Sequence, residues 1–151
     1  MTSTIRPGLF YDVETIAAYQ VEMAWETEKM KLDLPTVLKG VQAVIDDPAK
    51  GKYWVAEVNG LVVGCLLTVP EWSDWRNATV LWVHSVYVAP SARGAGLYKA
   101  LYTHVQELVR KSGGSLRGIR LYVDKTNTEA QKVYEKLGMN GEHYTLYEWM
   151  S

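Results

Sequence analysis

Ser85-Val-Tyr-Val-Ala-Pro-Ser-Ala-Arg-Gly-Ala-Gly-Leu-Tyr98 is the stretch of sequence on which the predicted fold depends. Its first residues are β-branched and aromatic, which is typical of a buried strand. Pro90 ends the strand, and Gly94 and Gly96 lead into a helix. The apolar residues of that helix recur at helical spacing, at Leu97, Leu101, Val105 and Leu108. A strand that passes through a glycine loop into a helix presents backbone N–H groups at the positive end of the helix dipole, and such a site binds phosphate.

Two well-known nucleotide-binding patterns do not fit this loop. The dinucleotide fingerprint requires a third glycine where this chain has Lys99. A P-loop ends in Gly-Lys-Ser or Gly-Lys-Thr, whereas Lys99 is followed by Ala100. A glycine turn without a ligand remains an alternative when the loop is considered alone.

The composition limits the class of protein. A chain of 151 residues predicts one domain, residues 1–151, large enough to bury a core. The net charge is −1 and the 16 basic residues are scattered, which argues against nucleic acid or an anionic membrane as a partner. The single cysteine, Cys65, excludes a disulfide framework and favours the cytoplasm. The N-terminus does not have the pattern of a signal peptide, and we find no apolar run of the roughly 20 residues that span a bilayer.

The order of the predicted elements is strand, two helices, three strands, helix, strand, helix, strand. Strands are expected at Thr2–Arg6, Tyr53–Val58, Leu61–Val69, Thr79–Val88, Ile119–Asp124 and His143–Trp149. Helices are expected to begin at Asp12 as N-cap, around Pro35, at the glycine loop, and at a capping box of Thr126 and Glu129. Asn59-Gly60 predicts a tight hairpin, and Gly138 predicts the end of the last helix. This order predicts an α/β fold with a mixed sheet.

The glycine loop resembles the acyl-CoA loop of the GNAT-type N-acetyltransferases. The family pattern is Arg/Gln-x-x-Gly-x-Gly/Ala after a short strand, commonly with Pro three residues before the Arg. Arg93, Gly96 and Pro90 match, whereas Tyr98 stands where Gly or Ala is usual. A ring at this position reshapes the start of the helix, so the pocket for the diphosphate or pantetheine is expected to differ locally from the family pattern.

A second signature of the same family follows downstream. The segment Asn127 to Met139 resembles Asn-x-x-Ala-x-x-x-Tyr-x-x-x-Gly-Phe, with Asn127, Ala130, Tyr134 and Gly138 matching and Met139 in place of the aromatic residue. Two signatures in this order are far more specific than either alone. The resemblance covers nearly the whole chain and implies a GNAT-like mixed, splayed central sheet flanked by helices in a single domain.

The resemblance implies acetyl-CoA as co-substrate and no metal. The backbone of Val86 and Val88 would pair with the pantetheine arm, and Arg93 with the loop N–H groups would hold the diphosphate. Asn127 would hydrogen-bond the pantetheine, and Tyr134 would lie near the thioester sulfur. The complete set of implied acetyl-CoA residues is Val86, Tyr87, Val88, Arg93, Gly94, Ala95, Gly96, Leu97, Tyr98, Lys99, Asn127 and Tyr134.

The implied reaction is attack of a neutral amine on the thioester carbonyl, which requires an oxyanion donor and a proton for the leaving thiolate. The Val86 N–H is a candidate oxyanion donor. Tyr134 is the candidate acid, because a phenol with a pKa of about 10 can protonate a thiolate whose thiol has a pKa of about 8.5. Tyr134 also has helical spacing from Ala130 and Leu137, so a core position is the alternative.

The general base has several candidates. His84 lies on the strand before the loop, is expected to be in phase with Val86 and Val88, and belongs to the residue type that titrates nearest neutral pH. Glu26 and Glu28 at the end of the first helix, and Asp74 in a tryptophan-containing loop, are rivals. An ordinary strand histidine and solvated surface carboxylates are the alternatives.

The implied function is an acetyl-CoA-dependent N-acetyltransferase acting on a primary amine, either a small amine or a protein amine. The alternatives are a non-catalytic acyl-CoA-binding or sensor domain of the same fold, and a structural domain without CoA. Glu22, Glu26 and Glu28, together with Trp72 and Trp75, predict a cationic or amphipathic acceptor. Solvated glutamates and tryptophans at a dimer contact or within their loop explain the same residues, so a homodimer remains open.

Overall fold

The computed structural model describes residues 2–151, which form two compact units. The first unit ends at Arg120 and contains every strand of the described chain. The second unit is Leu121–Ser151 and contains one helix, α4 (Thr128–Lys136). The single domain expected over residues 1–151 stays a prediction.

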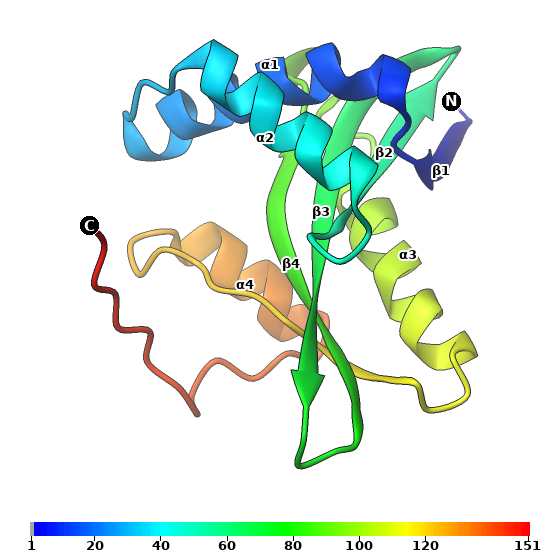
Figure 1. The fold of residues 1–151 in the computed structure, drawn as a ribbon, viewed down its shortest axis with the longest axis vertical. Coiled ribbons are helices and arrows are strands. Elements are labelled where there is room, and N and C mark those ends of the chain that lie inside the picture. Colours follow the sequence, from blue (N-terminus) through cyan, green and yellow to red (C-terminus); the bar gives the residue numbers. More distant parts are fainter. Residues whose placement is uncertain (1) are drawn as a thin grey trace. The chain divides into compact units, whose positions relative to one another are not determined.

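One five-stranded mixed sheet forms the centre of the first unit, with the strands in chain order from β1 to β5. Figure 1 labels the first four of these strands. Neighbouring strands are antiparallel from β1 to β4, and β5 is parallel to β4. The expected α/β fold with a mixed sheet is therefore confirmed. The strands are β1 (Ser3–Pro7), β2 (Lys52–Val58), β3 (Leu61–Ser73), β4 (Ala78–Val88) and β5 (Leu116–Arg120).

Three helices of the first unit cover the two faces of this sheet (Figure 1). They are α1 (Val13–Glu28), α2 (Leu34–Asp46) and α3 (Leu97–Lys111), with short 3-10 helices at Phe10–Asp12 and Pro90–Ala92. Tyr53 and Val55 of β2 pack in one core cluster with α1 and α2, whereas the ring of Trp54 lies 4.5 Å from that of His104 on α3. Because successive strand residues face opposite sides, α3 covers the face opposite α1 and α2.

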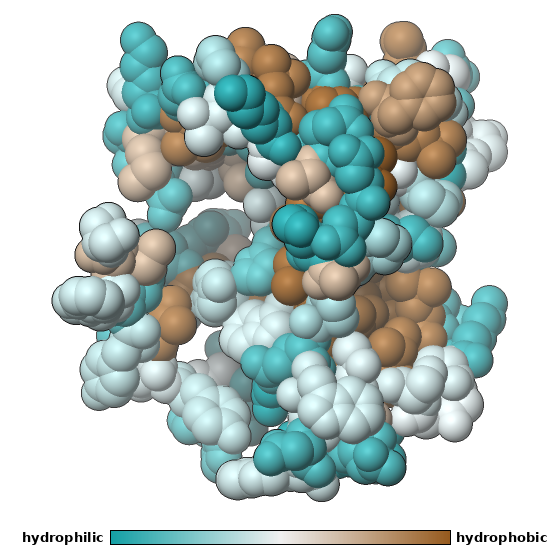
Figure 2. Space-filling view, in the orientation of Figure 1, coloured by the Kyte–Doolittle hydropathy of each residue, from teal (hydrophilic) through white to brown (hydrophobic). Residues whose placement is uncertain are grey.

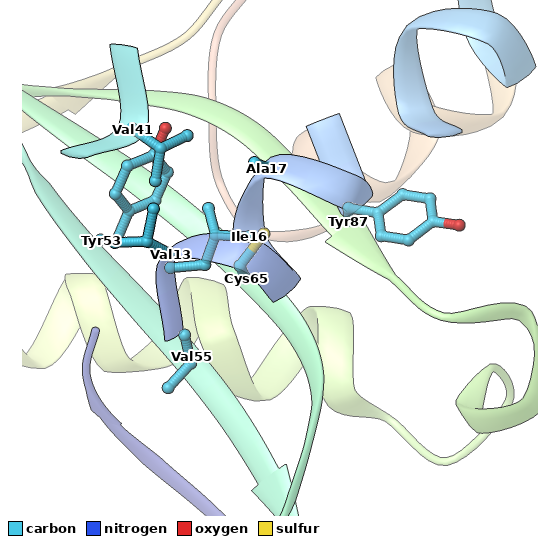
Figure 3. Packing of buried hydrophobic residues seen from close by; sticks show 8 residues of the cluster. All are labelled: Val13, Ile16, Ala17, Val41, Tyr53, Val55, Cys65 and Tyr87. Atoms are coloured by element: carbon cyan, nitrogen blue, oxygen red, sulfur yellow. The ribbon is translucent and has the colours of Figure 1, made fainter. Parts of the chain in front are cut away.

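The core between the sheet and the α1–α2 layer is apolar and closely packed (Figure 3). Helical spacing brings Val13, Ile16 and Ala17 of α1 onto the sheet, and the strands contribute residues that include Cys65. Cys65 is fully buried, as its position in an apolar run predicts, and burial raises the pKa of its thiol to about 12. The thiol is therefore protonated near neutral pH. The outward surface of α2 is largely hydrophilic in Figure 2, as expected for a helix with one buried face.

Local signals in the sequence form the turns that they predict. Asn59 and Gly60 adopt φ of 52° and 76°, the left-handed pair that a tight hairpin needs. The carboxylate of Asp33 accepts a hydrogen bond from the Thr36 N–H at 3.1 Å and caps α2, with Pro35 in the first turn. Gly138 has φ of +85° just after α4 and ends that helix as predicted.

β3 is longer than the sequence pattern predicts. It continues through Pro70 to Ser73, four residues past the expected end at Val69. Lys52, the first residue of β2, pairs with Thr68, so beyond this point β4 is the only strand neighbour of β3 among residues 2–151. A proline is tolerated there because an edge strand needs no N–H on its open side.

Other predicted boundaries were also wrong. β5 is Leu116–Arg120 instead of Ile119–Asp124, because the register with β4 begins at the pair Thr79–Leu116. The segment His143–Trp149 forms no strand, since a strand needs a hydrogen-bonded neighbour; Tyr147 is 91% exposed.

Two predicted helix caps also differ. Asn127 is the N-cap of α4 in place of Thr126, because its side-chain oxygen accepts the Ala130 N–H at 3.1 Å. Asp12 precedes α1 as expected, but its carboxylate does not cap that helix. It instead accepts hydrogen bonds from the Leu9 N–H and from Arg6, each at 2.8 Å. The negative charge of Asp12 therefore holds β1 and the approach to α1 together.

Candidate functional site

β4 carries an irregularity just before the glycine loop. Ser85 has φ of +54°, a left-handed conformation that costs a non-glycine residue about 1–2 kcal/mol. Across from it, Cys65 pairs with Tyr87 and Leu67 pairs with His84. Only Leu66 lies between these pairs on β3, whereas Ser85 and Val86 both lie between them on β4. The strand therefore contains a β-bulge, which changes the direction of the residues on either side.

The bulge decides which way His84 points. Paired residues share a face of a sheet, so His84 lies on the face of Leu67, Cys65 and Tyr87, which is the face covered by α1. Val88 pairs with Gly64 and lies on the opposite face. The expectation that His84 is in phase with Val86 and Val88 was wrong, because the extra residue reverses the alternation.

The two halves of β4 differ in their neighbours. β5 pairs with β4 from Thr79 to Trp82, so this half is hydrogen-bonded on both sides. From Val83 to Val88, β4 pairs with β3 alone within the described chain. The main chain of this second half thus has an edge without a strand partner in the first unit, and such an edge is the kind that an extended ligand can pair with. This loss of pairing corresponds to the splayed sheet that the sequence implies.

The loop after β4 has the backbone that its glycines predict. Gly94 and Gly96 have φ of +83° and +77°, and Gly96 is the N-cap of α3. A Cβ atom at either glycine would meet no heavy atom within 4 Å, so the loop surface is open toward a ligand. The Ala100 N–H donates to the Gly96 carbonyl at 3.0 Å, which starts the helix. Helix geometry leaves the N–H groups of a first turn to acceptors outside the helix, and this turn begins at Leu97.

A cavity of about 330 Å³ lies between α1, the end of β4 and this loop. Apolar side chains, together with Glu26 and Arg93, line this cavity. The lining residues are Met23, Glu26, Thr27, Val86, Tyr87, Val88, Ala92, Arg93, Gly94, Gly96, Leu97 and Tyr98. The structure thus brings together most of the acetyl-CoA residues that the first signature implies, with Ala95 and Lys99 in the same loop and first turn.

Arg93 is held by three contacts. Its Nε–H donates to the Val88 carbonyl at 2.9 Å, and its guanidinium lies 5.5 Å from the centre of the Tyr87 ring. Its two Nη groups donate to both carboxylate oxygens of Glu26 on α1, at 2.6 and 3.0 Å. The hydrogen bonds from Arg93 lower the pKa of Glu26. Glu26 is therefore a weaker base than the sequence alone suggests.

The Tyr87 hydroxyl group already has a hydrogen-bond partner on α1. The hydroxyl donates to the Glu22 carboxylate at 2.8 Å, and in Figure 3 it points away from Ile16 and Cys65. Burial, followed by the hydrogen bond and charge of Glu22, raises the pKa of Tyr87 to about 12. Of the residues at the end of β4, Tyr87 therefore contributes its backbone, while its side chain joins β4 to α1.

The candidate bases lie in different surroundings. His84 is half-buried, burial lowers its pKa, and its ring stacks on that of Trp82 at a centroid distance of 6.1 Å. Glu28 is exposed at the last position of α1. Asp74 lies in the exposed turn between β3 and β4 and accepts the Trp75 N–H at 3.0 Å. His84 is thus the one of these residues on the half of β4 that leads to the loop.

Asn127 and Tyr134 belong to the second unit. Asn127 caps α4 through its side-chain oxygen, and Tyr134 lies half-buried on that helix. Their binding and catalytic roles stay predictions that depend on the second signature.

The sequence named Glu26 of α1 as a site residue but not its neighbours Met23 and Thr27, which line the same cavity. Met23 lies three residues before Glu26 and four before Thr27, so it shares a helix face with each of them and was the readable signal for this wall. The partner of Glu26 was not readable, since Arg93 is 67 residues away in the chain.

The described residues contain no group of three or more His, Cys, Asp or Glu side chains that could hold a metal ion. No helix among them is long and apolar enough to cross a bilayer.

Solved structures with this fold include acetyltransferases. A possible acetyltransferase from Clostridium difficile 630 superposes with a TM-score of 0.93 at 38% identity, over 100% of this chain and 99% of that one. An aminoglycoside N-acetyltransferase solved with CoA has a TM-score of 0.78 at 18% identity, over 99% of this chain and 95% of that one, and shows the same fold.

Sequence comparison identifies the family. The model of the acetyltransferase (GNAT) family matches residues 11–139, so the chain belongs to this family. An uncharacterized N-acetyltransferase of Methanocaldococcus jannaschii is 32% identical over 99 residues, which cover 65% of this chain and 42% of that protein. A mycothiol acetyltransferase of Thermobispora bispora is 30% identical over 142 residues, covering 89% of this chain and 44% of that protein. The chain spans less than half the length of these curated relatives.

Proposed function

We propose that this protein is an acetyl-CoA-dependent N-acetyltransferase that moves an acetyl group to a primary amine by direct attack. The observation that carries the proposal is the open glycine loop at Gly96, which continues the half of β4 that pairs on one side only and borders a cavity. Membership of the acetyltransferase family and the fold neighbour crystallised with CoA support it.

The donor would lie along the end of β4 and the loop. The Val86 and Val88 backbone groups would pair with the amides of the pantetheine arm, because they lie where β4 lacks its β5 neighbour. The loop N–H groups from Gly94 to Lys99 would hold the diphosphate at the start of α3. Asn127 would hydrogen-bond the pantetheine, as the second signature implies.

The chemistry needs a base, an oxyanion donor and an acid. The amine nitrogen would form the new bond to the acetyl carbon, and the carbon–sulfur bond would break. The Val86 N–H would stabilise the oxyanion, and Tyr134 would give its proton to the thiolate. His84 would accept the proton of the amine, directly or through water. We prefer His84 to Glu26 as the base because the two hydrogen bonds from Arg93 stabilise the Glu26 carboxylate.

A cationic or amphipathic amine is the acceptor class that α1 supports. Glu22 lies on α1 beside the open half of β4 through its hydrogen bond with Tyr87, and Glu28 is exposed two residues beyond Glu26. Carboxylates attract an ammonium group. We place the reaction in the cytoplasm, since the single cysteine is a free thiol.

A thiol-release assay with a panel of amines tests the proposed function. Acetyl-CoA should raise the melting temperature, and at least one cationic amine should release CoA thiol in proportion to protein. A rise in melting temperature without thiol release would favour a CoA-binding sensor. No rise with acetyl-CoA would overturn the donor site itself.

Tyr134→Phe tests the acid, because it keeps the ring and removes the hydroxyl. We expect kcat to fall about 10²–10⁴-fold when chemistry limits the rate, with the acetyl-CoA KM little changed. Unchanged turnover would assign Tyr134 a packing role only.

A further inference from the structure

Arg93 faces two competing anions if the proposed donor site is correct. In the protein alone, both Nη groups of Arg93 donate to Glu26 in a two-bond arrangement, at 2.6 and 3.0 Å. In the proposed donor complex, the same Nη groups of Arg93 would donate hydrogen bonds to the diphosphate at the loop. The loop from Arg93 to Lys99 contains two cations, Arg93 and Lys99, so pairing with Glu26 cancels half of its positive charge.

We propose that Glu26 is an internal competitor for the donor-binding arginine: its carboxylate holds the place of the diphosphate and must be displaced when CoA binds. This inference rests on the proposed function. It assigns Glu26 a regulatory role in donor binding in place of the catalytic role that the sequence suggested.

The surrounding contacts make this exchange local. The Nε–H donates to the Val88 carbonyl at 2.9 Å and the guanidinium lies on the Tyr87 ring at 5.5 Å, so both anchors come from β4 and neither involves Glu26. The planar guanidinium therefore keeps its orientation while its Nη edge changes partner. Arg93 and Glu26 are each partly exposed, at 43% and 44%, so their pair is easily broken by an anion.

The exchange links the donor site to α1. When the diphosphate takes Arg93, the Glu26 carboxylate is released one helical turn from Glu22. Donor binding would thus increase the negative charge of the α1 surface that we propose for a cationic acceptor. The structure predicts that CoA promotes binding of a cationic amine, and by reciprocal linkage that the amine promotes binding of CoA.

Isothermal titration with CoA and with pantetheine, which lacks the diphosphate, tests the proposal. Glu26→Gln removes the competing charge and should tighten CoA binding about two- to five-fold, the strength typical of an exposed ion pair, without changing pantetheine binding. Glu26→Asp shortens the carboxylate and should give a smaller effect of the same sign. Glu107→Gln is the matched control, because it breaks a comparable pair with Arg110 on α3 and should leave CoA affinity unchanged.

A double-mutant cycle completes the test. Arg93→Gln should weaken CoA binding at least several-fold, and Glu26→Gln should have no further effect in that background. Weaker or unchanged CoA binding in Glu26→Gln, or an equal change for pantetheine, would overturn the competition. Absence of CoA binding in the unaltered protein and in every variant would instead overturn the proposed function.

Discussion

The first and second halves of β4 are both rich in β-branched and aromatic residues, but they have different neighbours in the sheet. Thr79–Trp82 is hydrogen-bonded to β3 and to β5, whereas Val83–Val88 is bonded to β3 alone and contains the bulge at Ser85. The backbone N–H and C=O groups of the first half form hydrogen bonds with the strands on both sides, so this half has a structural role. The second half has N–H and C=O groups along the edge that β5 does not pair with, and it leads directly to the glycine loop and the cavity. The donor site that we propose therefore lies at the segment of β4 where pairing with β5 stops.

The largest difference in CoA affinity is expected between two glycine-to-glutamate variants, one in the loop after the second half of β4 and one in the turn before β5, which pairs with the first half. Gly96→Glu places bulk and negative charge at the loop and should abolish CoA binding, because the backbone there has φ of +77° and opens toward the ligand. Gly114→Glu is the control in the turn before β5, at φ of +99° with open space. It should lower stability by about 1–2 kcal/mol and retain CoA affinity. Titration calorimetry on folded protein compares them, and equal affinities would break the comparison.

We expect the pH dependence of catalysis to arise from His84, which lies in the second half of β4. Burial holds the pKa of His84 below its ordinary value of 6.5, so the neutral form that acts as base persists at neutral pH. We expect kcat/KM to fall as pH drops below 6.5, since protonation then removes the base. His84→Gln should lower kcat/KM and lose this acid-side step, while the rise caused by the amine's own ionisation remains. A profile of kcat/KM from pH 5 to 9 provides the measurement, and an unchanged acid step would remove His84 from the mechanism.

A β-branched residue should be tolerated in one half and not in the other. Ser85→Val forces valine into φ of +54° and should lower the free energy of unfolding by about 1–2 kcal/mol, with weaker CoA binding if the bulge relaxes. Thr79→Val in the doubly paired half keeps an extended backbone and should change stability by less than about 0.5 kcal/mol. Urea unfolding of both variants measures the difference. A stable Ser85→Val protein with full affinity would show that the bulge is dispensable.

A small effect is also expected from an ion pair that lies beside the first half of β4. Glu71 and Arg120 pair across from β3 to β5, in the region where β4 lies between them. Glu71→Gln should cost at most about 1 kcal/mol of stability and leave CoA affinity unchanged, because partly exposed pairs are weak. Thermal unfolding and CoA titration measure both quantities. A gain in CoA affinity like that expected for Glu26→Gln would contradict our assignment of different roles to the two pairs.

Sequence patterns predicted the turns and helix ends that depend only on residues close together in the chain. The Asn59-Gly60 hairpin, the α2 start near Pro35 and the Gly138 helix end depend on the conformational limits of neighbouring residues. The donor loop was predicted by its glycines and by the family signature, and the cavity gathers most of its residues.

Features that depend on distant partners were not predictable from the sequence. Serine has no preference for the left-handed conformation that Ser85 adopts, so the bulge follows from the register with β3. That register placed His84 on the face opposite to Val88. The pairing of Glu26 with Arg93 joins two segments that no local pattern connects. These long-range contacts changed the assignment of bases far more than the assignment of the loop.

The burial of Cys65 has a practical consequence for measuring the reaction. It is the only cysteine of the chain, its side chain has no exposed surface, and its pKa is raised to about 12. Colorimetric thiol reagents react with thiolates, so the native protein should contribute almost no background to the detection of released CoA. The same reagent would report unfolding, because the thiol becomes reactive once the core opens. One chromogenic reagent can therefore follow turnover of the native protein and, in a separate trace without substrate, the integrity of each variant.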